Sequence, residues 1–251
     1  MRSIPFGLLL VLLLQNAVLA ASSVADLVAA YPGQFSAIEG NELVWRDGTR
    51  MPVSDGIAGK DFDTLLAKPD IDDMFAMPYR PGPIEANPAL NEDPGRVRYE
   101  PLFLKMYGDC KKGEVEKRLR PVAWVSGTVR FTDVNGAAEH LAAVVADLKK
   151  LPGALTKYLV PSAGTYVCRT IAGTDRRSMH AYGAAIDINT AYSDYWLWSA
   201  PKSGAIPYRN RIPFEIAEVF ERHGFVWGAK WYHYDTMHFE YRPELLGMAG
   251  K

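Results

Sequence analysis

The sequence predicts an α+β domain in which helices flank an antiparallel sheet, and three observations point to this class. Residues 122–125 and 128–131 alternate apolar and polar side chains around Ser126-Gly127, which is typical of a β-hairpin. Two helical patterns follow it along the chain. Strand-like runs at 184–189, 225–227 and 237–241 complete the set, and strands and helices in separate runs favour an antiparallel sheet.

The two helices are predicted from the spacing of their apolar residues and from the residues at their ends. The first is expected to be capped by Asn135 and to end at Pro152-Gly153, with a buried stripe of Leu141, Val144, Val145, Leu148 and Leu151. The second is expected to begin at Pro213, where a missing amide is harmless, and to stop at Gly224. Its buried stripe would be Ile216, Val219 and Phe220.

The amino terminus has the pattern of a signal peptide spanning residues 1–20. A basic start at Met1-Arg2 is followed by an apolar run at 4–14 and a small-residue end at 17–20. The apolar run is far shorter than the roughly 20 residues that span a bilayer. We therefore expect an exported protein, periplasmic or secreted, with no stable membrane anchor after signal cleavage.

The remainder divides into two predicted regions. Residues 21–100 form an amino-terminal extension with short helices at 24–31 and 62–68 and a strand at 42–45, and residues 78–94 make a connector rich in proline and glycine. No motif assigns this extension a function. Residues 101–251 form the second region, which contains every motif described below.

The net charge narrows the range of partners, and the two cysteines predict a disulfide bridge. The formal net charge is −1, so the chain has no basic field that would attract nucleic acid or a membrane surface. Cys110 and Cys168 are the two cysteines, and in an oxidising compartment they are expected to pair. Such a bridge would contribute about 4 kcal/mol in the chain-entropy model. Two separate buried thiols are the alternative.

Two segments, 178–189 and 235–240, carry the residues typical of a metal site. His180, Asp187 and His238 supply two imidazoles and a carboxylate, and a catalytic zinc site usually has three such protein ligands with a fourth position for water. Asp235 remains beside the last ligand. A carboxylate in that place can accept the proton of a water that attacks a carbonyl, which is the general-base function in metal-assisted hydrolysis.

The spacing within these segments predicts their local geometry. Gly183 permits a tight turn between a loop that carries His180 and a strand that carries Asp187. Glu240 lies two residues after His238, on the same side of a strand, so we expect it to support that imidazole. Asp235 is an odd number of positions from His238 and must lie on a turn or bulge to face the metal.

The pattern S-x-H-x-x-G-x-A-x-D followed by D-x-x-H-F-E resembles the zinc D-alanyl-D-alanine carboxypeptidases and endopeptidases of the VanY and VanX type, whose fold is shared with the Hedgehog signalling domain. The resemblance covers about residues 160–245. It implies that His180, Asp187 and His238 bind Zn²⁺ and that Asp235 is the catalytic base. It also implies an arginine on a strand upstream of the first motif, which stabilises the oxyanion; Arg169 is the best match, and Arg176 and Arg177 are weaker ones.

The resemblance implies a zinc-dependent peptidase that hydrolyses amide bonds in peptidoglycan stem peptides. A D-alanyl-D-alanine carboxypeptidase is favoured, and an endopeptidase of the L-alanyl-D-glutamate type is the alternative. A Hedgehog-like module that keeps zinc and binds the wall without hydrolysing it is a further alternative, against which the presence of Asp235 argues. The sequence leaves the oligomeric state open.

Several residues near the motifs admit other interpretations. Ser178 could be the nucleophile of a serine hydrolase, but the G-x-S-x-G elbow is absent, so we expect it to fix the loop that presents His180. Aromatic residues beside both motifs, including Trp227 and Tyr232, are candidates for the walls of a substrate cleft. His233 is predicted to support the site or contact substrate and to bind no metal.

Overall fold

The computed structural model describes residues 22–199 and 204–248, and its strands form three small antiparallel sheets. The predicted signal peptide lies outside the described residues. The central sheet has the order β6-β8-β7, with bounds Ala185–Asp187, His238–Tyr241 and Phe225–Trp227. A hairpin pairs β4 (Leu119–Ala123) with β5 (Thr128–Thr132), and the amino-terminal sheet contains β1 (Phe35–Glu39), β2 (Glu42–Trp45) and β3 (Arg50–Pro52).

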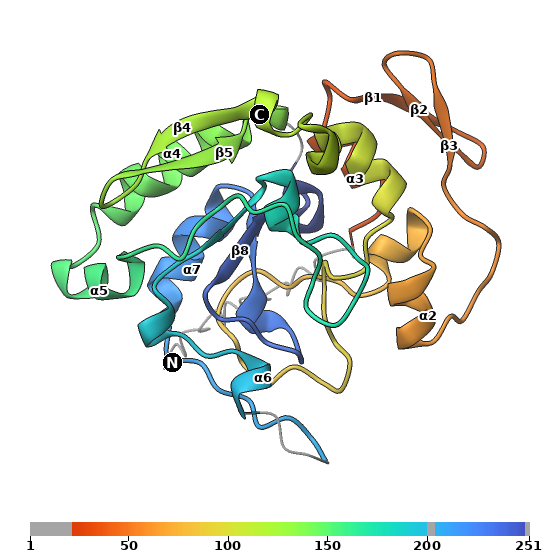
Figure 1. The fold of residues 1–251 in the computed structure, drawn as a ribbon. Coiled ribbons are helices and arrows are strands. Elements are labelled where there is room, and N and C mark those ends of the chain that lie inside the picture. Colours follow the sequence, from red (N-terminus) through yellow and green to blue (C-terminus); the bar gives the residue numbers. More distant parts are fainter. Residues whose placement is uncertain (1–21, 200–203, 249–251) are drawn as a thin grey trace, which may run out of the picture.

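Helices cover these sheets, which confirms the predicted α+β class (Figure 1). The described helices are α1 (Val24–Ala30), α2 (Phe62–Ala67), α3 (Glu100–Tyr107), α4 (Ala137–Leu148), α5 (Thr156–Leu159), α6 (Trp196–Ser199) and α7 (Phe214–Arg222). α4 packs on the β4-β5 hairpin, and α7 packs between α4 and β7. None of the helices in the described ranges is long and apolar enough to cross a membrane.

Both predicted long helices are present, but the cap of the first is different. α7 follows Pro213 and buries the predicted stripe, whereas α4 begins at Ala137 without a side-chain cap. Asn135 adopts a left-handed conformation with φ of 55°, which asparagine tolerates better than most residues. Its amide donates to Ala30 O and to the hydroxyl of Tyr241, so the prediction that Asn135 caps the helix is wrong.

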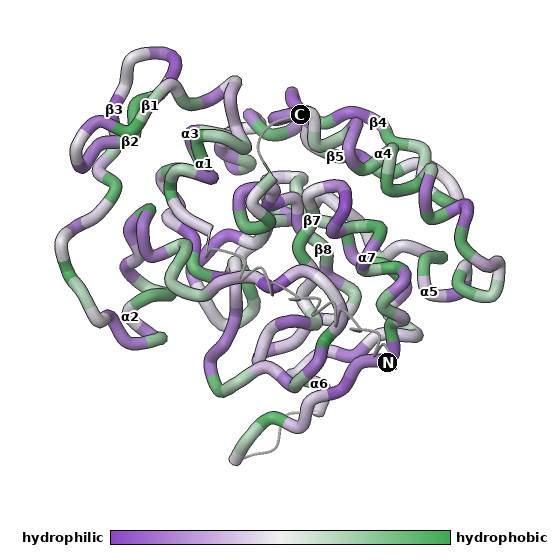
Figure 2. Tube along the Cα trace, turned by 180° about the vertical axis from the view of Figure 1, so that it is seen from behind, coloured by the Kyte–Doolittle hydropathy of each residue, from purple (hydrophilic) through white to green (hydrophobic). Residues whose placement is uncertain are grey.

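One apolar core joins the amino-terminal segment to the sheet that carries the motifs. Leu27 of α1, Tyr31 directly after that helix and Trp45 of β2 belong to the same buried cluster as Phe220 of α7 and Phe239 of β8. Figure 2 shows apolar stretches of β7 and β8 in the middle of the molecule, whereas α4 lies at its edge. The strand that bears His238 is buried along its whole length.

The predicted disulfide between Cys110 and Cys168 is confirmed, with Cα atoms 5.7 Å apart. It joins the turn after α3 to the segment that precedes Arg169. This segment was expected to be a strand, but it is irregular and makes a single β-bridge between Thr170 and Arg177. The covalent link therefore restrains a stretch of chain that few backbone hydrogen bonds hold.

Candidate metal centre

A short turn presents His180 to the centre of the molecule. The 3-10 turn Met179–Tyr182 begins at Ser178, whose hydroxyl accepts a hydrogen bond from the backbone N–H of His180 at 3.3 Å. It ends at Gly183 with φ of 66°, and a Cβ there would lie 2.4 Å from Leu119 Cδ2. Both the turn conformation and the close packing therefore require glycine at this position.

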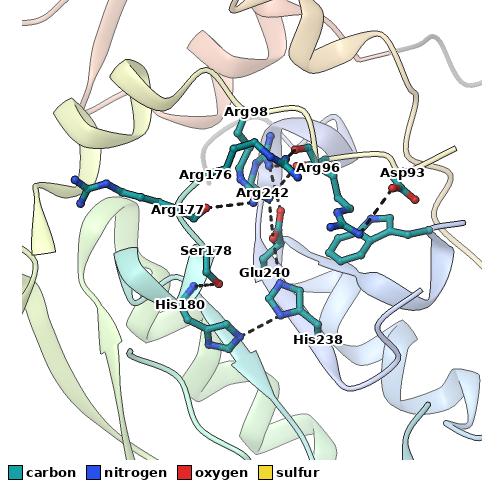
Figure 3. Close-up of polar contacts among 12 residues, drawn as sticks. Asp93, Arg96, Arg98, Arg176, Arg177, Ser178, His180, His238, Glu240 and Arg242 are labelled. Atoms are coloured by element: carbon teal, nitrogen blue, oxygen red, sulfur yellow. Dashed lines mark hydrogen bonds and ion pairs between the residues drawn. The ribbon is translucent and has the colours of Figure 1, made fainter. Parts of the chain in front are cut away.

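The other two residues meet because of strand register. Asp187 in β6 lies directly opposite His238 in β8, an antiparallel arrangement that places two side chains side by side. His180 Nε2 is 3.2 Å from both His238 Nδ1 and Asp187 Oδ1, and the latter two atoms are 3.0 Å apart. Figure 3 shows the two imidazoles facing each other from different elements. The structure therefore brings these three predicted residues together.

The spacing of these donor atoms fits a zinc ion. Ligands about 2.0–2.2 Å from a shared tetrahedral ion are roughly 3.3 Å from one another. The outer nitrogens of both imidazoles are also engaged, since His180 Nδ1 lies 2.8 Å from Thr165 O and His238 Nε2 lies 3.1 Å from Glu240 Oε2. When each of these nitrogens donates its N–H outwards, the lone pair of the other nitrogen points into the centre.

The charges at this centre favour a cation. Burial lowers the pKa of His238, but hydrogen bonds to Asp187 and Glu240 outweigh it and raise the pKa to about 10. Burial likewise raises the pKa of Asp187, yet the charges and hydrogen bonds of the two histidines lower it overall. In the absence of metal, a proton on His238 therefore supplies the positive charge that two buried carboxylates require.

Glu240 is held in its ionised form by arginines. Burial alone would raise its pKa, but Arg98, the hydrogen bond from His238, and Arg242 together lower it to about 2. Arg98 Nη1 lies 3.5 Å from Glu240 Oε2, and Arg242 Nη1 lies 3.1 Å from Glu240 Oε1. In Figure 3 Glu240 lies between His238 and these guanidinium groups. A fixed carboxylate beside a ligand imidazole orients that imidazole.

Asp235 lies on the turn that the base function requires. It precedes the turn at 236–237, and the N–H of His238 donates to Asp235 O at 3.1 Å. Its side chain lines a cavity of about 330 Å³ that His180 and His238 also line. Its Oδ1 is buried and has no hydrogen-bond partner among the described residues. Burial and the charge of Asp187 raise its pKa to about 6, which suits a proton acceptor near neutral pH.

A tight loop at residues 228–235 fixes the backbone of Asp235. The N–H of Asp235 donates to Gly228 O at 3.0 Å, and a Cβ on Gly228 would lie 2.5 Å from Asp235 O. Trp227 is fully buried and does not line the cavity, so it is no wall of the cleft. Its indole N–H donates to Thr236 O at 2.9 Å and thereby supports the turn between Asp235 and His238.

Of the three candidate arginines, Arg169 lines the metal-site cavity. Its side chain is exposed, and the hydrogen bond recorded for its guanidinium is a long one, 3.4 Å, to Thr170 O. The disulfide at Cys168 restrains its backbone. Arg176 and Arg177 line a different cavity instead. Arg169 is therefore the predicted arginine that can reach a substrate beside the metal.

His233 and Tyr232 lie outside the residues that line the cavity. His233 Nδ1 lies 2.7 Å from one carboxylate oxygen of Asp93, and its backbone N–H donates to the other at 3.0 Å. The hydroxyl of Tyr232 accepts a hydrogen bond from the N–H of Ile206. Both side chains therefore hold other segments in place.

Sequence analysis missed the part that the amino-terminal region plays in this cavity. Arg96 and Arg98 both line it, although they lie far from the motifs along the chain. Arg96 is stacked over Trp231, with its guanidinium carbon 5.4 Å from the ring centre. The alternation Arg96-Val97-Arg98 after the connector was the one local signal, and it does not indicate a site by itself.

Comparison with known proteins agrees with this geometry. Residues 172–241 match the model of a peptidase family described as D-alanyl-D-alanine carboxypeptidase. The match includes the three clustered residues and Asp235, and it excludes Arg169 and the amino-terminal region. Searches of curated proteins and of solved structures gave no significant match. The resemblance predicted from the two motifs is thereby confirmed over this stretch: the segment that carries the candidate metal centre matches the family described as D-alanyl-D-alanine carboxypeptidase.

Proposed function

We propose that the protein is an exported zinc peptidase that hydrolyses amide bonds in peptidoglycan stem peptides, with D-alanyl-D-alanine as its favoured target. One observation carries this proposal. The donor atoms of His180, Asp187 and His238 lie 3.0–3.2 Å apart, and the two histidines line a cavity together with Asp235, whose Oδ1 has no hydrogen-bond partner among the described residues. The family match over the same segment supports the peptidase chemistry and the wall substrate.

Zinc suits this donor set better than calcium or magnesium. Two imidazole nitrogens and one carboxylate oxygen are ligands typical of zinc, whereas calcium and magnesium prefer oxygen ligands alone. Three protein ligands also leave a coordination position for water or substrate. When bound, the ion would polarise the scissile carbonyl and lower the pKa of a nearby water molecule.

The side chains of the chain supply the remaining steps. The buried carboxylate of Asp235 accepts the proton of the attacking water and then donates it to the leaving amine. This uses the oxygen that has no partner among residues 22–199 and 204–248. Arg169 lines the cavity, and its guanidinium stabilises the negative charge that develops on the carbonyl oxygen.

The cavity lining favours a substrate that ends in a carboxylate. Arg96, Arg98 and Arg169 line it beside the carboxylates of Asp235 and Glu240. Arg98 pairs with Glu240, so the exposed guanidinium of Arg169 is the group best placed to attract an anionic chain end. A carboxypeptidase acts next to such an end, whereas an endopeptidase must accommodate chain on both sides. An L-alanyl-D-glutamate endopeptidase and a wall-binding module without activity are the alternatives.

Export would bring the protein to this substrate. The signal-peptide pattern at residues 1–20 and the disulfide between Cys110 and Cys168 both suit an oxidising compartment outside the cytoplasm. Peptidoglycan lies in that compartment.

The proposal is tested by incubating the mature protein with pentapeptide muropeptides and identifying products by mass spectrometry. We expect free D-alanine and the matching tetrapeptide, loss of both with a chelator, and recovery with added zinc. Cleavage inside the stem peptide would establish the endopeptidase alternative. A zinc-loaded protein that binds muropeptides and leaves them intact would refute hydrolysis.

A further inference from the structure

Residues 92–98, here called the strap, contact two segments that carry residues of the candidate metal site. The strap lies at the end of the proline- and glycine-rich connector, outside the segment that matches the family. It contacts the loop at 228–235, which ends at Asp235, and β8, which begins at His238. Figure 3 shows Arg98 above Glu240, and Asp93 farther from the two imidazoles, next to Arg96.

Three consecutive residues of the loop, 231–233, are hydrogen-bonded to the strap. The indole N–H of Trp231 donates to Pro94 O at 2.7 Å, and the N–H of Tyr232 donates to Glu92 O at 2.8 Å. The carboxylate of Asp93 binds His233 through two contacts of 2.7 and 3.0 Å. Asp93 is fully buried, so water does not compete for its oxygens. The strap thereby fixes the loop just before Asp235.

The strap holds β8 through a different set of contacts. Arg98 pairs with Glu240 Oε2, the same oxygen that contacts the outer nitrogen of His238. Gly95 O accepts a hydrogen bond from Arg242 Nη1 at 2.8 Å. Gly95 has φ of 91°, and a Cβ there would lie 3.0 Å from Leu245 Cδ1, so glycine permits this close approach.

We propose that the strap is part of the active site and contains two positioning residues with separable effects. Arg98 fixes the carboxylate of Glu240 and, through it, the imidazole of His238, so it determines metal affinity. Asp93 fixes the loop that carries Asp235, so it determines turnover with little effect on metal affinity. The effect on turnover rests on the proposed function, whereas the effect on metal affinity needs no hydrolysis.

The effects on metal affinity and on turnover are separable because Arg98 and Asp93 contact different parts of the site. Arg98 is one contact away from a ligand imidazole, and replacing such outer partners typically lowers metal affinity about 10- to 100-fold. Asp93 touches the loop and none of the three clustered residues. A displacement of about 1 Å in a reacting group can lower turnover about 100-fold. A brace that acted only on folding would lower the Tm and leave both metal affinity and turnover unchanged.

The test compares Arg98→Met and Asp93→Asn with a matched control, Asp70→Asn. Asp70 is also a buried carboxylate that holds its surroundings in place, because it accepts hydrogen bonds from Asp55 N at 2.9 Å and from Asp73 N at 2.8 Å. It does not line the metal-site cavity. Zinc affinity is measured by competition with a chromophoric chelator, coordination by the absorption of the cobalt-substituted protein, and turnover with pentapeptide muropeptides.

We expect Arg98→Met to weaken zinc binding about 10- to 100-fold and to alter the cobalt spectrum. We expect Asp93→Asn to keep the wild-type zinc affinity and cobalt spectrum. Its kcat should fall about 100-fold, with KM nearly unchanged. Asp70→Asn should lower the Tm alone. If Arg98→Met does not fold, Arg98→Lys keeps the charge without the planar fork and should weaken zinc binding by a smaller factor.

Two results would overturn the inference. Unchanged zinc affinity in the Arg98 variants, with Tm losses like that of Asp70→Asn, would make the strap a brace for folding. Equal losses of zinc affinity in the Asp93 and Arg98 variants would show that the two effects are not separable. A wild-type protein that binds no zinc would remove the proposed function itself, and the same titration reveals that first.

Discussion

Replacing Asp235 with asparagine should abolish hydrolysis and yet stabilise the metal-free protein above neutral pH. Burial and the charge of Asp187 raise the pKa of Asp235 from 3.8 to about 6, so folding is penalised whenever this carboxyl is ionised. A difference of about two pKa units corresponds to about 3 kcal/mol at most. The penalty is complete above about pH 6, decreases as the pH falls, and disappears below about pH 4. Asparagine removes it at every pH.

The assay is urea unfolding of chelator-treated protein at pH 8 and pH 4. We expect Asp235→Asn to exceed the wild type by up to about 3 kcal/mol at pH 8 and to equal it at pH 4. Asp147→Asn is a control of opposite sign, because hydrogen bonds from Lys150 and His223 lower the pKa of Asp147 to about 2. This control should lose stability at pH 8 and recover towards wild type as the pH falls below 4.

The reasoning is refuted if Asp235→Asn is less stable than the wild type at pH 8, because the carboxylate would then be stabilised by partners that the structure does not show. Turnover by the same variant at the wild-type rate would remove Asp235 from the mechanism. The two outcomes are independent of each other, since unfolding is measured without metal and turnover with it.

Three further predictions concern the metal centre. His180→Ala should lose bound zinc, which elemental analysis of the purified protein measures, and a full equivalent of zinc would refute its assignment as a ligand. Zinc binding near pH 7 should release about one proton, because the pKa of His238 is raised to about 10 without metal. Calorimetry in buffers of different ionisation enthalpy measures the number of protons released. A value of zero would contradict the prediction. Gly183→Ala should destabilise the protein by about 1–3 kcal/mol and weaken zinc binding, because φ is 66° and the new Cβ would clash with Leu119. An unchanged Tm and zinc affinity would be inconsistent with this turn.

The parts of the site that could be predicted are encoded locally. The turn that ends at Gly183 and the pairing of Glu240 with His238 follow from short spacings and from the period of a strand. Asp235 had to lie on a turn if it was to face the metal, and the structure has that turn. The α+β class followed from the spacing of apolar residues in the same way.

The parts that could not be predicted depend on contacts between distant residues. Asp93 and His233 are 140 residues apart, and no local pattern links them. Asn135 had the residue type of a helix cap, but its amide found partners in other elements. Trp227 lies beside the second motif in sequence, yet it is buried in the core. Tertiary packing decided each of these cases.

The most direct test of the metal centre is to measure zinc coordination in the purified protein. The structure predicts one zinc ion per chain and an X-ray absorption spectrum with two imidazole nitrogens and at least one oxygen at about 2.0–2.2 Å. His238→Ala should remove one imidazole from that spectrum or abolish binding. A protein that binds no zinc, or whose bound zinc keeps both imidazoles after His180 or His238 is replaced, would contradict the account.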